Sequence, residues 1–506
     1  MKKTAFLLIL ALIICQLSPA ALAAAQQCGD SVYWSYNSAT RTLTFSGSGR
    51  MYDYTSKNLP PWYDSYIKYG KVDNIEFVDG DITYIGDYAF HGLHVPNVTL
   101  PDTVLEIGKN AFDRSEIRTI HLPAQLETIG YEAFSGGTHL ESIVIPDRVT
   151  TIGISAFDGC SHATSLTLPA GLKTISFTSF SGMSSLTELE LPEGLETLGS
   201  SAFSNCTQLD EVTIPASVTS VGTSPFWGCS ALEAIHVAPG NPVVSEVDGV
   251  LFNKAGTTLL QYPAGRMEES YTVPDTVTRL NSSAFAGCMH LKRATIPDGI
   301  AELPLSVFRR CPELTHVDLP DTITKIDRGA FYQCPLLTEL DIPYGVTELG
   351  QEAFWQCGLQ RVSIPETVTS FGNYLFDYCP TELTLYVIAG SPAHSYAVNN
   401  RKNFAFLSPF DRADLVLPGD LTTIEDEAFM GADAAIVYLP AGVTEIGHRA
   451  FAGCPNLKHI NLPDGASIAT DAFDDCGAVY LYGASGSAAE AYASSHDNVT
   501  FVALEQ

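Results

Sequence analysis

The stretch LTELELPEGLETLGSSAFSNC, residues 186–206, decides the fold of this chain. Leu189 and Leu191 alternate with Glu188 and Glu190, and this period of two predicts a strand with one buried face. Pro192 ends that strand because proline has no backbone donor. Two leucines within residues 195–198 predict a second short strand. Phe203 and its apolar neighbours predict a tight, 3₁₀-like turn that points into the core.

The same pattern recurs along most of the sequence. Twelve of the fourteen gaps between the repeated phenylalanines are 22 or 23 residues, and the other two are insertions of roughly two repeat lengths. Most units also carry a proline 11 residues before the phenylalanine. The fifteen phenylalanines are Phe90, Phe112, Phe134, Phe157, Phe180, Phe203, Phe226, Phe285, Phe308, Phe331, Phe354, Phe376, Phe429, Phe451 and Phe473.

A period in the twenties predicts a solenoid, in which each coil covers the apolar face of the next. The fold class is therefore mainly β, with about 15 repeats and parallel strands spaced about 4.8 Å apart. We expect the phenylalanine rings to stack into one continuous interior column.

Three kinds of segment interrupt the repeats. Residues 32–45 predict a hairpin that caps the first coil, and residues 248–261 predict a second hairpin that protrudes from the stack. The related stretches GSPAHSYA (390–397) and GSAAEAYA (486–493) predict two short helices, each sealing an open end. The predicted segments are a signal peptide at 1–25, an N-terminal hairpin cap at 26–70, leucine-rich repeats at 71–232, a hairpin insertion at 233–273, repeats at 274–382, an internal cap at 383–407, repeats at 408–478 and a C-terminal cap at 479–506.

The N-terminus and the charge indicate an exported protein. Lys2 and Lys3 precede an apolar run that is too short to span a membrane, and small residues follow it, as in a secretory signal. The net charge of −30 disfavours nucleic acid and anionic membranes as partners. We therefore expect a secreted protein without a membrane span, whose acidity keeps it soluble.

The cysteines occupy a repeated position rather than a disulfide pattern. Ten of the twelve follow a repeat phenylalanine by three residues, where other units have leucine, methionine or alanine. This position predicts buried, reduced thiols. Disulfides between neighbouring coils and a zinc site are the alternatives. The ten are Cys160, Cys206, Cys229, Cys288, Cys311, Cys334, Cys357, Cys379, Cys454 and Cys476.

The repeat L-x-x-L-x-L-P-x-x-L-x-x-L-G-x-x-A-F-x-x-C resembles that of the BspA-like leucine-rich repeat family of bacterial and protist surface proteins. The N-terminal stretch CGDSVYWSYNSATRTLTFSGSGRMYDY and the insertion DGVLFNKAGTTLLQYPAGR resemble elements of the same family. The resemblance implies an exported solenoid, and some members are taken to be adhesins for host proteins such as fibronectin or fibrinogen. Because the sequence ends without a wall-sorting motif, we expect release or non-covalent retention at the cell surface.

Large side chains at an otherwise small or polar position are the first candidates for ligand binding. The position directly after the repeat phenylalanine holds Arg309, Tyr332 and Trp355 in consecutive units and Trp227 in another. Tyr438 is a further candidate on an outward strand position. Packing against neighbouring turns is the alternative to a row of rings that stacks on a sugar or a peptide.

Carboxylates on outward strand positions are the second candidates. Like charges on adjoining coils repel one another unless a cation intervenes, which makes calcium the one cofactor to consider. A solvated acidic face is the alternative. The residues are Glu188, Glu190, Glu211, Asp318, Glu339 and Asp341.

The sequence contains none of the common hydrolase, phosphate-binding or dinucleotide-binding motifs. Cys160 near His162 and Cys288 near His290 suggest a thiol nucleophile, but both cysteines fall on the inward position. We therefore predict a non-catalytic protein that recognises or adheres to an extracellular protein or glycan. The alternative function is a self-associating component of a surface layer or biofilm.

Overall fold

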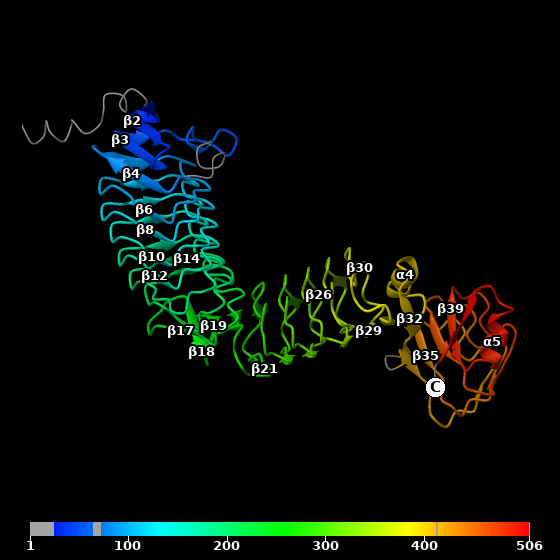
Figure 1. Cartoon of the computed structure of the whole chain (residues 1–506). Coiled ribbons are helices and arrows are strands. Elements are labelled where there is room, and N and C mark those ends of the chain that lie inside the picture. The colour runs from blue at the N-terminus through cyan, green and yellow to red at the C-terminus, as the bar shows by residue number, and fades with distance from the viewer. Residues whose placement is uncertain (1–24, 64–71, 411–412, 505–506) are drawn as a thin grey trace, which may run out of the picture. The chain divides into compact units, whose positions relative to one another are not determined.

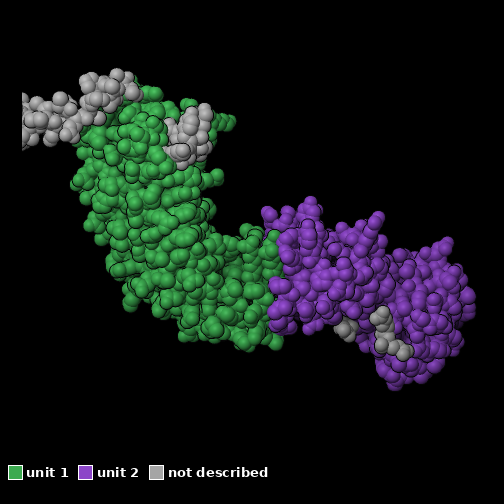
Figure 2. All heavy atoms as spheres, in the orientation of Figure 1, with its two compact units in different colours: residues 1–314, 330–334 green, residues 315–329, 335–506 purple. Residues whose placement is uncertain are grey.

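The protein is described by a computed structural model of residues 25–63, 72–410 and 413–504. All but one residue of the predicted signal peptide lie outside these ranges. The described chain is a mainly β leucine-rich repeat solenoid with short parallel strands, which confirms the predicted fold class (Figure 1). It divides into two compact units (Figure 2): unit 1 comprises residues up to 314 together with 330–334, and unit 2 comprises 315–329 and the residues from 335 onward.

A hairpin covers the first coil of unit 1, as predicted. Its strands are β2 (Gly29–Asn37) and β3 (Thr42–Met51), which pair antiparallel, with β1 (Gln26–Gln27) added to the edge of β2. Strand β3 also pairs in parallel with the first strands of the repeats. Trp62 is fully buried beneath this hairpin, and its indole N–H donates to the carbonyl of Ala89, 2.8 Å away.

Each coil of unit 1 contributes strands to two sides of the solenoid. One side consists of β4 (Asn74–Val78), β6 (Asn97–Thr99), β8 (Thr119–His121), β10 (Ser142–Val144), β12 (Ser165–Thr167), β15 (Glu211–Ile214), β17 (Ala234–Val237), β21 (Ser270–Thr272) and β23 (Arg293–Thr295). The second side consists of β5 (Ile82–Ile85), β7 (Glu106–Ile107), β9 (Thr128–Ile129), β11 (Thr151–Ile152), β13 (Thr174–Ile175), β14 (Thr197–Leu198), β16 (Ser220–Val221), β22 (Arg279–Leu280) and β24 (Glu302–Leu303).

The repeat at residues 186–206, from which the fold was predicted, is itself less regular than predicted. Residues 187–191 follow the path of the coil but form no strand, whereas the second predicted strand is present as β14. Glu188, Glu190 and Glu211 of the following coil are all exposed.

The insertion in unit 1 is a hairpin, but it does not protrude. Strands β18 (Val244–Val247), β19 (Val250–Asn253) and β20 (Thr258–Gln261) pair antiparallel, and β20 then pairs in parallel with β22. The first three residues of β19 are buried. The prediction of a protruding element was therefore wrong, because the apolar residues of the hairpin are used to continue the core.

The third side of every coil is a turn that carries the phenylalanine, and its backbone is not 3₁₀. In nearly every unit the residue two positions before the phenylalanine has a positive φ, for example 53° at Asn110 and 51° at Thr178. The phenylalanine N–H donates to the next coil, as in Phe90 to the carbonyl of Ala111 at 2.7 Å. The turns are thus linked along the stack by their own row of hydrogen bonds.

The repeat phenylalanines, of which only Phe429 is partly exposed, stack face to face between neighbouring coils. In unit 1, Phe112 and Phe134 have centroids 5.2 Å apart and an interplanar angle of 2°. In unit 1 the insertion separates the stack Phe90 to Phe226 from the stack that begins at Phe285, and in unit 2 the internal cap separates Phe376 from the stack Phe429 to Phe473, so the single continuous column predicted is interrupted. Further stacked pairs run from Phe285 to Phe331 in unit 1 and join Phe354 to Phe376 in unit 2.

The cysteines point inward at the position predicted for them. Their thiols donate to the carbonyl of a phenylalanine in the preceding coil, as in Cys334 to Phe308 at 3.0 Å and Cys476 to Phe451 at 3.0 Å. This contact gives the repeated thiol a packing role. Whether the thiols are reduced in the native protein stays a prediction.

Unit 2 contains two groups of repeats, each closed by a strand–helix–strand segment. The strands of the first group are β25 (His316–Asp318), β26 (Lys325–Ile326), β27 (Glu339–Asp341), β28 (Glu348–Leu349), β29 (Arg361–Ile364), β30 (Ser370–Phe371), β31 (Thr384–Val387) and β32 (Asn403–Phe406). Those of the second are β33 (Leu415–Val416), β34 (Thr423–Ile424), β35 (Ile436–Tyr438), β36 (Glu445–Ile446), β37 (His459–Asn461), β38 (Ser467–Ile468), β39 (Val479–Gly483) and β40 (Val499–Ala503).

The two predicted helical caps are both present. Helix α4 (Pro392–Asn399) joins β31 to β32, and α5 (Ala488–Ala493) joins β39 to β40; in each case the two strands pair in parallel. Ser391 caps α4 by accepting a hydrogen bond from the backbone of His394. The precise segment boundaries predicted from sequence stay predictions.

Candidate functional site

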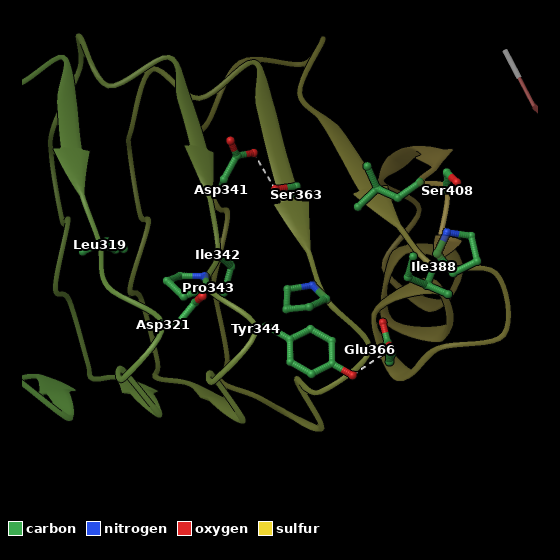
Figure 3. Close-up of a pocket in the computed structure, with 13 residues that line it drawn as sticks. Leu319, Asp321, Asp341, Ile342, Pro343, Tyr344, Ser363, Glu366, Ile388 and Ser408 are labelled. Atoms are coloured by element: carbon green, nitrogen blue, oxygen red, sulfur yellow. Dashed lines mark hydrogen bonds between the residues drawn. The ribbon is translucent and has the colours of Figure 1, made fainter. Parts of the chain in front are cut away.

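A groove crosses the end of the first repeat group in unit 2 (Figure 3). It has a volume of about 340 Å³ and lies among the segments that follow β25, β27 and β29 and the two ends of the internal cap. Ile342, Pro343, Ile388 and Pro409 line it and are buried, so the floor of the groove is apolar.

Carboxylates and a tyrosine surround this floor. Asp321, Asp341, Tyr344 and Glu366 line the groove, and Figure 3 shows Asp341 with Ser363 on one side and Tyr344 with Glu366 on the other. The hydroxyl of Tyr344 donates to Oε1 of Glu366 at 3.1 Å. These segments come together because each proline ends its strand at the same level of successive coils.

Asp341 connects the groove to the outer face of the sheet. Its Oδ1 accepts from the hydroxyl of Ser363 at 2.5 Å and from Nη1 of Arg361 at 2.9 Å, because Glu339–Asp341 and the start of β29 are paired in register. The guanidinium of Arg361 also lies over the ring of Tyr386, 5.0 Å from its centroid.

A shallower hollow of about 270 Å³ adjoins the groove on β25 and β27. It is lined by three of the predicted acidic residues, Asp318, Glu339 and Asp341, together with His316. Nε2 of His316 lies 2.8 Å from Oδ1 of Asp318. The structure therefore brings these three acidic residues onto one face.

The predicted calcium site gains no support from this arrangement. Within the described ranges, no group of three or more His, Cys, Asp or Glu side chains is placed to hold a metal ion. Of the unit 1 candidates, Glu188 and Glu190 are exposed, and Glu211 lies 3.5 Å from Nε2 of His236. Calcium binding stays a prediction.

The predicted row of large side chains is partly buried rather than exposed. In unit 1 the guanidinium of Arg309 lies 4.5 Å from the centroid of Tyr332, and Nε1 of Trp227 is buried without a hydrogen-bond partner. In unit 2 the ring of Trp355 packs edge-on against Tyr378 at 4.9 Å. These contacts favour the packing interpretation, and a binding role for the four residues stays a prediction.

Tyr438 lies at a different hollow of unit 2. It lines a cavity of about 420 Å³ together with Phe410, whose ring centroid is 5.8 Å away. Its side chain is 37% exposed at the outward strand position expected for it, and a binding role for Tyr438 stays a prediction.

An exposed apolar stripe in unit 1 was missed in the sequence. Tyr131, Ile154 and Phe177 are 41%, 43% and 51% exposed, and each follows the corner between the second strand and the phenylalanine turn. Backbone bonds from Glu132 to Ile154 and from Ser155 to Phe177 place these positions on adjacent coils. Comparing this position between units would have revealed the stripe.

The groove could not be found in that way. Tyr344 follows a strand-ending proline, where other repeats have alanine, aspartate, glutamate or glycine, and this is the one local signal in the sequence. Ile388 comes from the internal cap and Pro409 from the segment just after it, and the positions of both against the repeats depend on the tertiary structure.

The two Cys–His pairs do not form a nucleophile and a base. Cys160 is fully buried, its thiol donates to the carbonyl of Phe134 at 3.4 Å, and burial raises its pKa above the usual value. Burial likewise raises the pKa of Cys288. A thiolate is therefore disfavoured at both positions.

Within the described part of the chain, the helices are all too short or too polar to cross a membrane.

Comparison with known proteins identifies the repeat. A family model described as "BspA type Leucine rich repeat region" matches residues 63–162, 128–257, 266–382 and 396–481. A leucine-rich cell surface protein from Faecalibacterium prausnitzii A2-165 is 24% identical, with a TM-score of 0.52, over 74% of this chain and 97% of that one. The pneumococcal vaccine antigen PcpA is 20% identical, with a TM-score of 0.45, over 95% of this chain and 100% of that one. No curated protein matches the chain.

Proposed function

The chain belongs to the BspA-type leucine-rich repeat family, and we propose that it is an exported recognition protein that binds an extracellular protein or glycan in the groove of unit 2. The proposed role is adhesion or capture without catalysis. The groove is the observation that carries the proposal, because it combines an apolar floor with polar groups at its edge, as binding sites for organic ligands do.

The construction of the solenoid supports this proposal. Its phenylalanines, leucines and inward cysteines are consumed by packing, so the outward positions are the ones that remain for recognition. The groove lies where repeats meet the internal cap, and such junctions create concave surfaces that a regular stack of coils does not have.

Export is proposed on separate grounds. The basic and then apolar residues 1–25 have the order of a secretory signal. N-terminal sequencing of the protein isolated from the organism that produces it would test this. A mature N-terminus near residue 26 is expected, and an intact Met1 on the isolated protein would contradict export by this signal.

A binding screen tests the proposed function. Immobilised extracellular-matrix proteins and glycans are probed with the mature chain, with a Tyr344→Ala variant and with a Tyr131→Ala control. The control removes a half-exposed tyrosine from unit 1. We expect at least one ligand to bind the mature chain saturably. Its affinity for the Tyr344→Ala variant should be at least tenfold lower, and its affinity for the Tyr131→Ala control should be unchanged. Ligands that bind both variants like the native chain would exclude the groove as the site.

A further inference from the structure

The groove has an unusual balance of charge for a site with an apolar floor. Three carboxylates line it, those of Asp321, Asp341 and Glu366, and among the described residues that line it there is no lysine, arginine or histidine. Arg361, which lies outside the lining, pairs with Asp341 at 2.9 Å and compensates one of these charges. The whole chain carries a net charge of −30, so the surrounding field adds to the negative potential of the groove.

Two of these carboxylates are held in place by the protein and still have an oxygen to offer. Both bonds to Asp341 reach Oδ1, and the bond from Tyr344 to Glu366 reaches Oε1. The side chain of Asp341 is 72% exposed. Among the described residues, no side chain or backbone group donates to the second oxygen of Asp341 or of Glu366, so each can accept from a donor that enters the groove.

We propose that the groove binds a lysine or arginine side chain from an extended segment of a protein partner. This rests on the proposed function and narrows its ligand to a protein. Lysine and arginine combine an aliphatic stem with a cationic head. The stem would lie on the floor formed by Ile342 and Ile388, and the head would reach the carboxylates at the edge.

Other ligands satisfy this geometry less well. A metal ion would need at least a third converging ligand, and the described residues provide no such group. A neutral glycan would leave the free carboxylate oxygens without a charged donor, and a charge-assisted hydrogen bond is the stronger contact. An acidic ligand would be repelled.

A matched series of peptides tests the proposal. The probes are blocked tripeptides with leucine on both sides of lysine, arginine, norleucine or glutamate, titrated into the mature chain and followed by calorimetry or NMR. Norleucine keeps the aliphatic stem and removes the charge. We expect the lysine and arginine probes to bind at least tenfold more tightly than norleucine, and the glutamate probe not to bind.

Matched variants separate the groove from the diffuse charge of the protein. The double change Asp341→Asn and Glu366→Gln is expected to weaken binding of the lysine probe at least tenfold. The control double change Glu188→Gln and Glu190→Gln removes the same charge from exposed positions in unit 1 and is expected to have no effect. Thermal unfolding of each variant confirms that it is folded.

Three results would overturn the proposal: equal binding of the norleucine probe, equal weakening by both double variants, or no binding of the lysine probe at millimolar concentration. The proposed function, recognition of a ligand in the groove, would survive these results if the binding screen finds a ligand whose affinity depends on Tyr344 but not on Asp341 and Glu366. Both proposals fall if no ligand in the screen depends on Tyr344.

Discussion

The backbone of the phenylalanine turn is left-handed at two positions in most coils, one before and one after the ring. Residues such as Ser201, two places before Phe203, adopt the first of these without being glycine. The second is often glycine, as in Gly182 with a φ of 73°. Left-handed backbone is unfavourable for residues with a Cβ, by about 1–2 kcal/mol each. The hydrogen bonds between successive turns compensate for this cost.

Adding a methyl group at Gly182 tests this account. A Cβ there would lie 3.1 Å from the Cα of Gly159 in the neighbouring coil, in addition to the unfavourable φ. We expect Gly182→Ala to lower the free energy of unfolding by about 1–2 kcal/mol, measured by urea denaturation.

Gly171→Ala, in the same repeat as Gly182, is the matched control. No atom lies within 4 Å of a Cβ at Gly171, and its φ is not in the left-handed region. The control is expected to leave stability unchanged or raise it by about 0.4–1 kcal/mol. Equal losses in the two variants would show that the left-handed turn is not the cause.

The caps of unit 2 use one aromatic residue in the same way. Tyr396 of α4 presents its ring edge-on to Phe376, with centroids 6.3 Å apart, and Tyr492 of α5 does the same to Phe473 at 5.7 Å. Each tyrosine covers the open face of the last stacked ring, which no further coil would bury. The two similar sequence stretches therefore predicted their common role correctly.

Removing the ring of Tyr492 should expose the last ring of the stack that ends at Phe473. We expect Tyr492→Ala to cost about 3–5 kcal/mol locally, because a buried ring is lost. Hydrogen exchange should accelerate in β38 to β40 and remain unchanged in β8 of unit 1, since coils of a solenoid depend on their neighbours.

Tyr492→Phe separates the ring from the hydroxyl. It keeps the contact with Phe473 and loses the hydrogen bond from the hydroxyl to the carbonyl of Thr470. A much smaller effect, of about 0.5–1.5 kcal/mol, is expected. A loss as large as that of the alanine variant would mean that the hydroxyl, not the ring, holds the cap.

At the scale of the whole molecule, burial of thiols and phenols makes stability depend on alkaline pH. Burial raises the pKa of Cys28 and Cys379 to about 12 each, and also raises the pKa of Tyr396 and Tyr492 to about 12. In the unfolded chain, cysteine ionises near 8.5 and tyrosine near 10. As pH rises through these values, the unfolded state releases protons first and is favoured.

The free energy of unfolding should therefore change little between about pH 7 and 8 and fall above that range. The slope approaches about 1.4 kcal/mol per pH unit for each buried thiol once the pH exceeds its unfolded pKa. Urea denaturation at pH 7, 9 and 10 measures this, and Cys379→Ala should reduce the slope. A stability that does not change over this range would contradict the burial of the thiols.

The sequence by itself determined the period, the parallel stacking, the repeated inward ring, the inward position that ten of the cysteines occupy, and both helical caps. These follow from residue type and spacing, because a single coil cannot bury its own apolar residues and must stack. It did not reveal the left-handed turns, since most of them are occupied by residues other than glycine. It also misplaced the second hairpin, whose apolar residues are equally compatible with a protruding and an inserted strand.

Only the tertiary structure decided where a ligand could bind. Asp341 and Tyr344 come from one coil and Glu366 from the next, whereas Ile388 comes from the internal cap and Pro409 from the segment just after it. The repeat fixes the spacing of the first three, but the cap closes the groove through contacts between segments far apart in the chain. Such contacts depend on how whole elements pack, which local patterns of residues do not encode.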